Sequence, residues 1–383
     1  MKKVLLPLVA LSLTQAVAQP LPVLTVGLMI PTSGRLAPAG TEVRNSTLLT
    51  LNQARLEFRR LGFDLRFKTF DDAGSPDEGR KRAQEAVNDP RVLLFIGPIF
   101  SSVMLSASEV LAPARVGMVT PTATALSVTT RGLKNVNRIV AREDAQSDAG
   151  VRFIAETLGA KSAFIVTDPT AVSPTSVAQY PQTFAEAGLK VLGSASPTDR
   201  KNLKPVLDAI LAAKPDVVYY AGLYDLAVPL LRGLREAGSP ALFVGTSSLE
   251  VADFRKQAGD ALKGVYYTAS VAPPTAYAGA KTFLNDYKRR FKTDASSLNV
   301  LAYDATKVAL AALRDAIDQN GGKVPSREQV ETALRSVSVD NLLSGDIRFN
   351  SSGDRRSAQI FVLRYGDDLN PRVTGSVRVE ATR

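Results

Sequence analysis

The chain has 383 residues, which is too long for one ordinary domain and enough for two domains with sizeable cores. Its hydrophobic fraction of 45% and charged fraction of 22% are typical of a folded protein, and the absence of Cys and His excludes disulfides, His-ligated metals and Ser-His or Cys-His catalysis. The net charge of +10 is spread along the chain with no nucleic-acid-binding motif, so it indicates a solvated surface rather than a nucleic-acid partner.

The first predicted element is an export signal at residues 1–18. Two lysines precede an apolar run at 4–13 that is too short to span a bilayer, and Ala16-Val17-Ala18 is typical of a cleavage site. We therefore expect a periplasmic chain that begins at Gln19 after cleavage near Ala18. Because no Cys follows the signal, we expect no acyl anchor. A buried N-terminal helix is the alternative.

Strands and helices then alternate along the chain. The predicted strands of the first run are 23–30, 65–70, 92–96 and 117–120, and its helices are 41–60, 77–87 and one from about 102. After residue 145 the alternation restarts, with helices at 147–158, 203–213 and 226–237, one ending at 187, and strands at 163–167, 190–194, 216–220, 242–245 and 264–268. This alternation predicts parallel sheets with helices on both faces, and two runs predict two similar lobes.

The last part of the chain is predicted to form helices at 277–291, 298–318 and 327–337 and then short strands between 346 and 379. These elements must pack on lobes already formed, and the simplest topology crosses between the lobes near Ala141, Val271 and Phe349. We therefore expect an α/β fold of two doubly wound parallel-sheet lobes, joined by a three-segment hinge, with a ligand cleft between them. The expected lobes are 19–141 plus 272–348, and 142–271 plus 349–383.

Four loops of the first lobe are candidate ligand contacts, because open parallel sheets bind ligands at the carboxyl ends of their strands. These loops are 32–39, 71–76, 98–102 and 121–125. In the third loop, Ser101 and Ser102 stand at a predicted helix start, where free backbone N–H groups can hold a carboxylate or phosphate. The alternative is that one serine only caps the helix.

The fourth loop, which includes Thr122, Ala123 and Thr124, has small and polar residues, so a ligand could approach its backbone amides closely; an ordinary turn is the alternative.

Other kinds of binding site have less support in the sequence. No G-x-G-x-x-G follows the first strand and no P-loop motif is present, which disfavours nucleotide binding. Asp71-Asp72 could be a metal or acid–base pair, but adjacent residues at a strand end point in different directions, which favours a structural loop.

At these loops the sequence resembles the leucine/isoleucine/valine-binding family of periplasmic solute receptors, which has the type I binding-protein fold. The segments that carry the resemblance, in order and spacing, are Val26–Gly34, Phe70–Pro76, Phe95–Ser102, Val119–Ala125, Val217–Tyr224 and Leu301–Ala305. The resemblance implies a three-strand hinge, interleaved lobes and delivery of a solute to an ATP-driven importer in the membrane.

The resemblance also implies site residues. The family holds the ligand's α-carboxylate with a serine of the third loop and a threonine of the fourth, which correspond to Ser101 and Thr124, with a backbone contact from Thr122. Residues of the second lobe, Ser173, Tyr224 and Ser247, are expected to recognise the remainder of the ligand.

The second-lobe pocket differs from the family pattern. Amino-acid binders carry an acidic residue after the strand at 242–245 that pairs with the ligand ammonium; Ser247 stands there, and Glu250 follows three residues later. The expected pocket aromatics correspond to 170–173 and to Leu223, for which Tyr224 could substitute. Because a buried ammonium without a carboxylate is costly, we expect a solute of the branched-chain amino acid type or a relative without the ammonium group.

The sequence therefore predicts a monomeric, periplasmic solute-binding subunit of an ABC importer, with permease and ATPase subunits as partners. We expect no catalytic residue, metal or cofactor. One alternative is a ligand-sensing receptor for a membrane kinase or chemoreceptor. The other is an exported hydrolase, which the absence of His, Cys and a convergent acidic motif disfavours.

Overall fold

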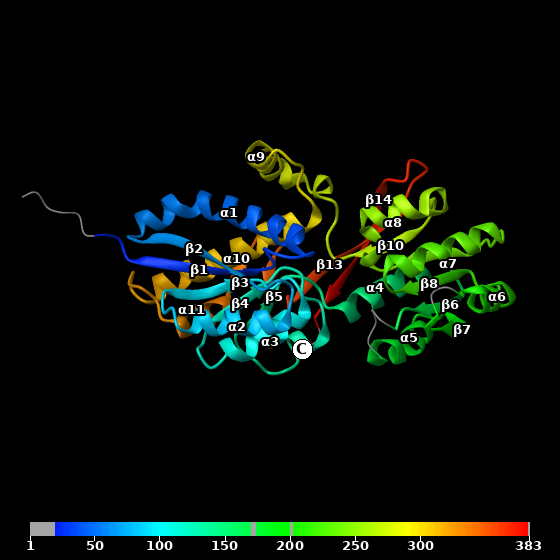
Figure 1. Ribbon diagram of the computed structural model, residues 1–383, viewed down its shortest axis with the longest axis horizontal. Helices are drawn as coiled ribbons and strands as arrows, with labels where there is room; N and C mark the ends of the chain where they lie inside the picture. The colour runs from blue at the N-terminus through cyan, green and yellow to red at the C-terminus, as the bar shows by residue number, and fades with distance from the viewer. Residues whose placement is uncertain (1–19, 170–173, 200–201, 382–383) are drawn as a thin grey trace, which may run out of the picture.

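The computed structural model describes residues 20–169, 174–199 and 202–381, and it contains two α/β lobes that lie side by side along the long axis of the molecule (Figure 1). The expected export signal and Ser173 lie outside the described residues. Each lobe is built on one main sheet, of five strands in the first lobe and seven in the second.

The first sheet is parallel throughout, in the order β2-β1-β3-β4-β5. Its strands are β1 (Val23–Ile30), β2 (Asp64–Asp71), β3 (Val92–Ile96), β4 (Gly117–Thr120) and β5 (Val136–Arg138). The inner strand β1 is buried on both faces, to which its successive side chains point in turn. Leu28 and Ile30 belong to one hydrophobic core, and Met29 between them belongs to the other.

Helices cover both faces of the first sheet. One face carries α1 (Ala37–Arg60), α9 (Lys281–Phe291), α10 (Ser297–Gln319) and α11 (Arg327–Ser336), and the other carries α2 (Pro76–Val87) and α3 (Ser101–Leu111). The late helices α10 and α11 thus pack on a sheet whose strands all precede residue 139 (Figure 1). A short ladder of β11 (Ser338–Val339) and β12 (Ile347–Arg348) follows them.

The second sheet has the order β14-β13-β10-β9-β8-β6-β7. Its parallel strands are β6 (Ser162–Thr167), β7 (Lys190–Ala195), β8 (Val217–Ala221), β9 (Leu242–Gly245) and β10 (Tyr266–Ala269); β13 (Ser357–Tyr365) and β14 (Pro371–Glu380) add an antiparallel hairpin. The hairpin strands are 9 and 10 residues long, longer than the short strands predicted from the sequence.

The helices of the second lobe are α4 (Glu143–Glu156), α5 (Pro174–Glu186), α6 (Lys204–Ala213), α7 (Tyr224–Glu236) and α8 (Ala252–Ala258). The 3₁₀ turns of the chain are η1 (Leu126–Val128), η2 (Ser247–Glu250), η3 (Gly259–Leu262), η4 (Pro274–Ala276) and η5 (Ala278–Ala280). The prediction that α4 begins at Ser147 is wrong by one turn, since the helix begins at Glu143. This earlier start brings two acidic residues into its first turn.

Within the described residues, three segments connect the lobes: the link from β5 to α4, the link from β10 to η4, and the link from β12 to β13. The first and third links are bonded to each other, because the Arg138 N–H donates to the Gly353 carbonyl over 2.9 Å and Arg138 forms a parallel bridge with Asp354. The buried Arg138 guanidinium also donates from Nε to Asp354 Oδ1 over 2.6 Å.

Candidate ligand-binding site

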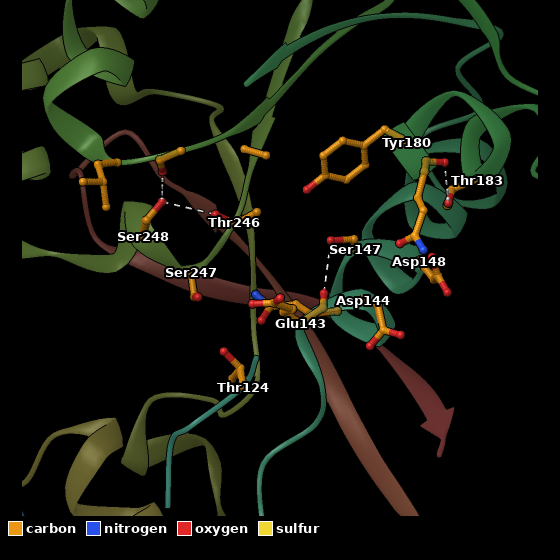
Figure 2. A pocket seen from close by; sticks show the side chains of 15 residues that line it. Thr124, Glu143, Asp144, Ser147, Asp148, Tyr180, Thr183, Thr246, Ser247 and Ser248 are labelled. Atoms are coloured by element: carbon orange, nitrogen blue, oxygen red, sulfur yellow. Dashed lines mark hydrogen bonds between the residues drawn. The ribbon is translucent and has the colours of Figure 1, made fainter. Parts of the chain in front are cut away.

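A cavity of about 210 Å³ lies at the carboxyl ends of β8 and β9 in the second lobe and is faced by Thr124 of the first lobe (Figure 2). The residues that line it are Thr124, Glu143, Asp144, Gln146, Ser147, Asp148, Gln179, Tyr180, Thr183, Ala221, Gly222, Leu223, Thr246, Ser247 and Ser248. Two of the predicted site residues, Thr124 and Ser247, therefore meet at one cavity.

The third and fourth loops of the first lobe are bonded together behind Thr124. The Thr122 hydroxyl donates to the Ile99 carbonyl over 2.8 Å, and Ser101 Oγ accepts the Ala125 N–H over 3.2 Å. Gly97, which ends β3, has a φ of +94°, and a Cβ there would lie 2.2 Å from the Met29 carbonyl oxygen, so only glycine fits this turn. The two loops form one preassembled surface.

The start of α3 has no side-chain cap. Phe100 is the N-cap residue, and no side chain hydrogen-bonds to the first turn, so neither Ser101 nor Ser102 acts as the capping residue. Ser101 is half-buried beside the fourth loop, and Ser102 is exposed. The helix start therefore keeps backbone N–H groups that a negatively charged ligand group can accept from.

Arg138 holds the backbone on both sides of Thr124. Its Nη1 donates to the carbonyls of Ala123, over 3.2 Å, and Ala125, over 2.8 Å, and its charge is balanced by Asp354. Ala123 itself is buried. Since the neighbouring carbonyls are turned toward Arg138, the half-buried Thr124 side chain is left facing the cavity (Figure 2).

The first turn of α4 forms the floor of the cavity, and sequence reasoning missed it. The Glu143 N–H donates to the Thr124 carbonyl over 3.0 Å, and the half-buried Glu143 carboxylate accepts the Leu126 N–H. Burial is the largest cause that raises the pKa of Glu143, with a further rise from Asp144. The acidic pair directly after the predicted crossing at Ala141 is a typical first-turn pattern and could have indicated the helix start.

The opposite wall consists of α5 and the loops after β8 and β9. The buried Tyr180 ring packs edge-to-face on Tyr219, with ring centroids 5.4 Å apart, and burial raises the pKa of Tyr180. Figure 2 shows the Tyr180 hydroxyl directed away from α5 toward the cavity. Ser248 donates to the Gly222 carbonyl, which joins the two loops, while Ser247 is exposed at the cavity.

Two further second-lobe residues do not line the cavity. Tyr224 is directed toward α8, where its hydroxyl lies 3.5 Å from Asp253 Oδ2. Glu250, the acid near the position expected to pair with an ammonium, instead accepts a hydrogen bond from Ser297 Oγ of α10 over 3.0 Å. This bond links the two lobes, and burial is the largest cause that raises the pKa of Glu250.

The acidic pair at the end of β2 has structural partners. Asp71 Oδ1 accepts the N–H groups of Thr32 and Ala73, over 2.8 and 3.0 Å, and Asp72 Oδ1 accepts the Gly74 N–H over 2.8 Å. Among the described residues no group of three or more potential ligands could hold a metal ion, and no helix is long and apolar enough to cross a membrane.

Two lobes joined by three links, with a polar cavity at the strand ends between them, form an architecture suited to holding a small solute. Comparison with known families agrees. The chain belongs to the family described as "Periplasmic binding protein", whose sequence profile matches residues 23–369. As a member of this family it is a solute-binding protein and not an enzyme, and the predicted type I fold is confirmed.

The similarity to individual binding proteins extends over most of both chains. The "Leu/Ile/Val-binding protein BraC3" of Rhizobium johnstonii is 29% identical over 346 residues, which cover 89% of this chain and 91% of the relative. The structure of a leucine-binding protein, LivK, from Thermotoga maritima has a TM-score of 0.76 at 23% identity, covering 92% of this chain and 98% of that one. A solute-binding protein of an ABC transporter from R. palustris, in complex with benzoate, has a TM-score of 0.72 at 19% identity, covering 94% and 98%.

Proposed function

We propose that this chain is the solute-binding subunit of an ABC importer and that it binds a small solute with a carboxylate group, of the branched-chain amino acid type. The observation that carries the proposal is the preassembled surface of the third and fourth loops. It presents Thr124 to a cavity whose other lining residues belong to the second lobe. The uncapped start of α3 is bonded to the Thr124 loop through Ser101, although Ser101 and Ser102 do not themselves line the cavity. Donors of this kind are suited to a carboxylate.

The similar proteins support this ligand class. Leucine, isoleucine, valine and benzoate, which are named for three of them, all have a carboxylate in common. In our proposal the carboxylate contacts Thr124 and the backbone near Ser101. The second lobe, with Ser247 and Tyr180, then closes over the rest of the solute, and the exclusion of water strengthens these hydrogen bonds.

The Thr124 hydroxyl is tested by Thr124→Val, which removes the hydroxyl and keeps the shape of the side chain. We expect binding of a carboxylate solute, measured by calorimetry, to weaken about tenfold, because one hydrogen bond to a charged group is lost. Thr41→Val is the matched control, since Thr41 is an exposed threonine on α1 whose hydroxyl bonds only to its own helix. Equal affinities of the two variants would contradict the assignment of Thr124.

The remaining parts of the proposal concern export and delivery. We propose that residues 1–18 direct export, that cleavage follows Ala18, and that the mature protein acts as a monomer with permease and ATPase subunits in the inner membrane. The family is periplasmic by description, which supports this location. N-terminal sequencing of the exported protein would test the cleavage site, and solute-dependent stimulation of a reconstituted importer would test delivery.

A further inference from the structure

The charged side chains that line the cavity in the described residues are all acidic. Among the described residues that line it, three are acidic, Glu143, Asp144 and Asp148, and none is a lysine or an arginine. A solute with only a negative charge would enter an unfavourable potential there. A solute that also carries a positive charge would meet a partner.

Only part of this negative charge is balanced by the protein. Asp144 forms an ion pair with Arg142, and Arg138 is paired with Asp354. Within the described part of the chain, no lysine or arginine forms an ion pair with Glu143, whose carboxylate accepts the Leu126 N–H. The charge of Arg138 favours the ionised carboxylate, but burial outweighs it and raises the pKa of Glu143. A half-buried carboxylate in this position is stabilised by a bound cation.

Glu143 is fixed beside the carboxylate-binding loop. Its backbone N–H bonds to the Thr124 carbonyl and its side chain to the Leu126 N–H, so it is tied to both ends of a three-residue segment of the first lobe. Figure 2 shows Glu143 next to Thr124 and Ser247 at the base of the cavity. Donors for a carboxylate and an acceptor for an ammonium therefore lie side by side, as the two charged groups of an α-amino acid do.

The other acidic candidate is directed elsewhere. Glu250 does not line the cavity and is held by Ser297 of the first lobe, and Ser247, which lines it, carries no charge. The expectation from the sequence that an ammonium would lack a carboxylate partner depended on these two positions alone.

We propose that Glu143 is the residue that binds the protonated amine of the solute, and that it makes the cavity selective for α-amino acids over carboxylates without an amine. This inference rests on the proposed function. The ammonium has three N–H donors, and the Glu143 carboxylate and the Thr124 hydroxyl supply acceptors for it. Because Glu143 begins the second-lobe helix α4 and is also bonded to the Thr124 loop of the first lobe, it lies where the two lobes meet at the base of the cavity.

The test uses the mature chain and calorimetry with the standard L-amino acids and the 2-oxo acid counterparts of the aliphatic and aromatic ones. For the best amino acid, we expect Glu143→Gln to weaken binding about 100-fold, since an ion pair in a partly desolvated site is lost, while binding of the 2-oxo acid stays equal or improves. Glutamine keeps an oxygen to accept the Leu126 N–H, so the melting temperature should not change. Glu156→Gln is the matched control: Glu156 is an exposed carboxylate at the other end of the same helix and does not line the cavity, and we expect less than about a threefold effect.

The outcomes separate the two proposals. Wild-type protein that binds a 2-oxo acid as tightly as its amino acid, or Glu143→Gln protein that keeps amino-acid affinity, would overturn the role of Glu143 and leave the proposed carboxylate solute intact. Wild-type protein that binds no compound of either set would overturn the proposed solute class, and the role of Glu143 with it.

Discussion

The two walls of the cavity are built in different ways. On the first-lobe side, the Thr124 loop is joined to the third loop through hydroxyl and amide bonds and is held from behind by the buried Arg138–Asp354 pair. On the second-lobe side, Ser247 is exposed, and the loops after β8 and β9 are joined through the Ser248 side chain. In the function proposed above, the first wall, whose loops are bonded together, is the rigid wall that recognises the group common to a class of solutes, and the second is the variable wall that meets the rest of the solute.

The largest effect is expected where the rigid wall is anchored. Replacing Arg138 with Met removes the main ion-pair partner of the buried Asp354, which among the described residues keeps only the Thr129 hydroxyl and the more distant Arg142 at 3.8 Å. It also leaves the carbonyls of Ala123 and Ala125 without their donor, so the free energy of unfolding should fall by about 3 to 5 kcal/mol. Urea denaturation followed by circular dichroism measures it. The control is Arg314→Gln, which breaks an exposed ion pair with Glu57 and should cost less than about 1 kcal/mol. A similar loss of unfolding free energy in both variants would contradict the role of the Arg138–Asp354 pair as the anchor of the first-lobe wall.

A second prediction concerns the free-energy penalty of burying the Asp72 carboxylate in a first-lobe loop. Asp72 is fully buried, only one of its oxygens accepts a hydrogen bond, and burial raises its pKa from 3.8 to about 6. Because the folded-state pKa is the higher one, this group imposes no penalty below pH 3.8, and stability is lost as the pH rises through about 6. Asp72→Asn should therefore stabilise the protein at pH 8 by about 1 to 3 kcal/mol and have little effect near pH 4.

Melting temperatures of wild type and Asp72→Asn across pH 4 to pH 8 would measure this difference. A gain that is the same at all pH values would assign the effect to shape rather than charge. A loss of stability at pH 8 would mean that the Asp72 carboxylate is stabilised in its charged form by the loop, contrary to its buried surroundings.

The sequence could predict the parts of the protein that depend on local patterns, but not those that depend on contacts between distant residues. Buried strands such as β1 and β3 and the glycine and proline breaks after them are local patterns, so the strand ends, and with them Thr124 and Ser247, could be located. The Arg138–Asp354 pair joins residues 216 positions apart, and no periodicity reveals such a contact. Glu143 was missed for a different reason, because the predicted helix started one turn too late.

The direction of the Tyr224 side chain also could not be predicted from the sequence. Its sequence position directly after the β8 loop made it a reasonable substitute for a pocket aromatic. As the first residue of α7, however, its direction is set by the helix, and the side chain extends toward Asp253 of α8. Side-chain direction at the start of a helix depends on backbone geometry that a sequence pattern does not specify.

The smallest effect is expected on the variable wall. Ser247 is exposed and lines the cavity, so Ser247→Ala should change the free energy of unfolding by less than about 0.5 kcal/mol. The substitution should instead change the selectivity among solutes. Because Ser247 meets the part of the solute away from the carboxylate, we expect the order of affinities among amino acids to change by factors of about three to ten, while the preference for amino acids over 2-oxo acids is kept. Calorimetry with the same panel used for Glu143 measures both quantities. If Ser247→Ala instead weakened all carboxylate solutes equally, recognition of the common group would extend across both walls, and the division of roles between the lobes would be wrong.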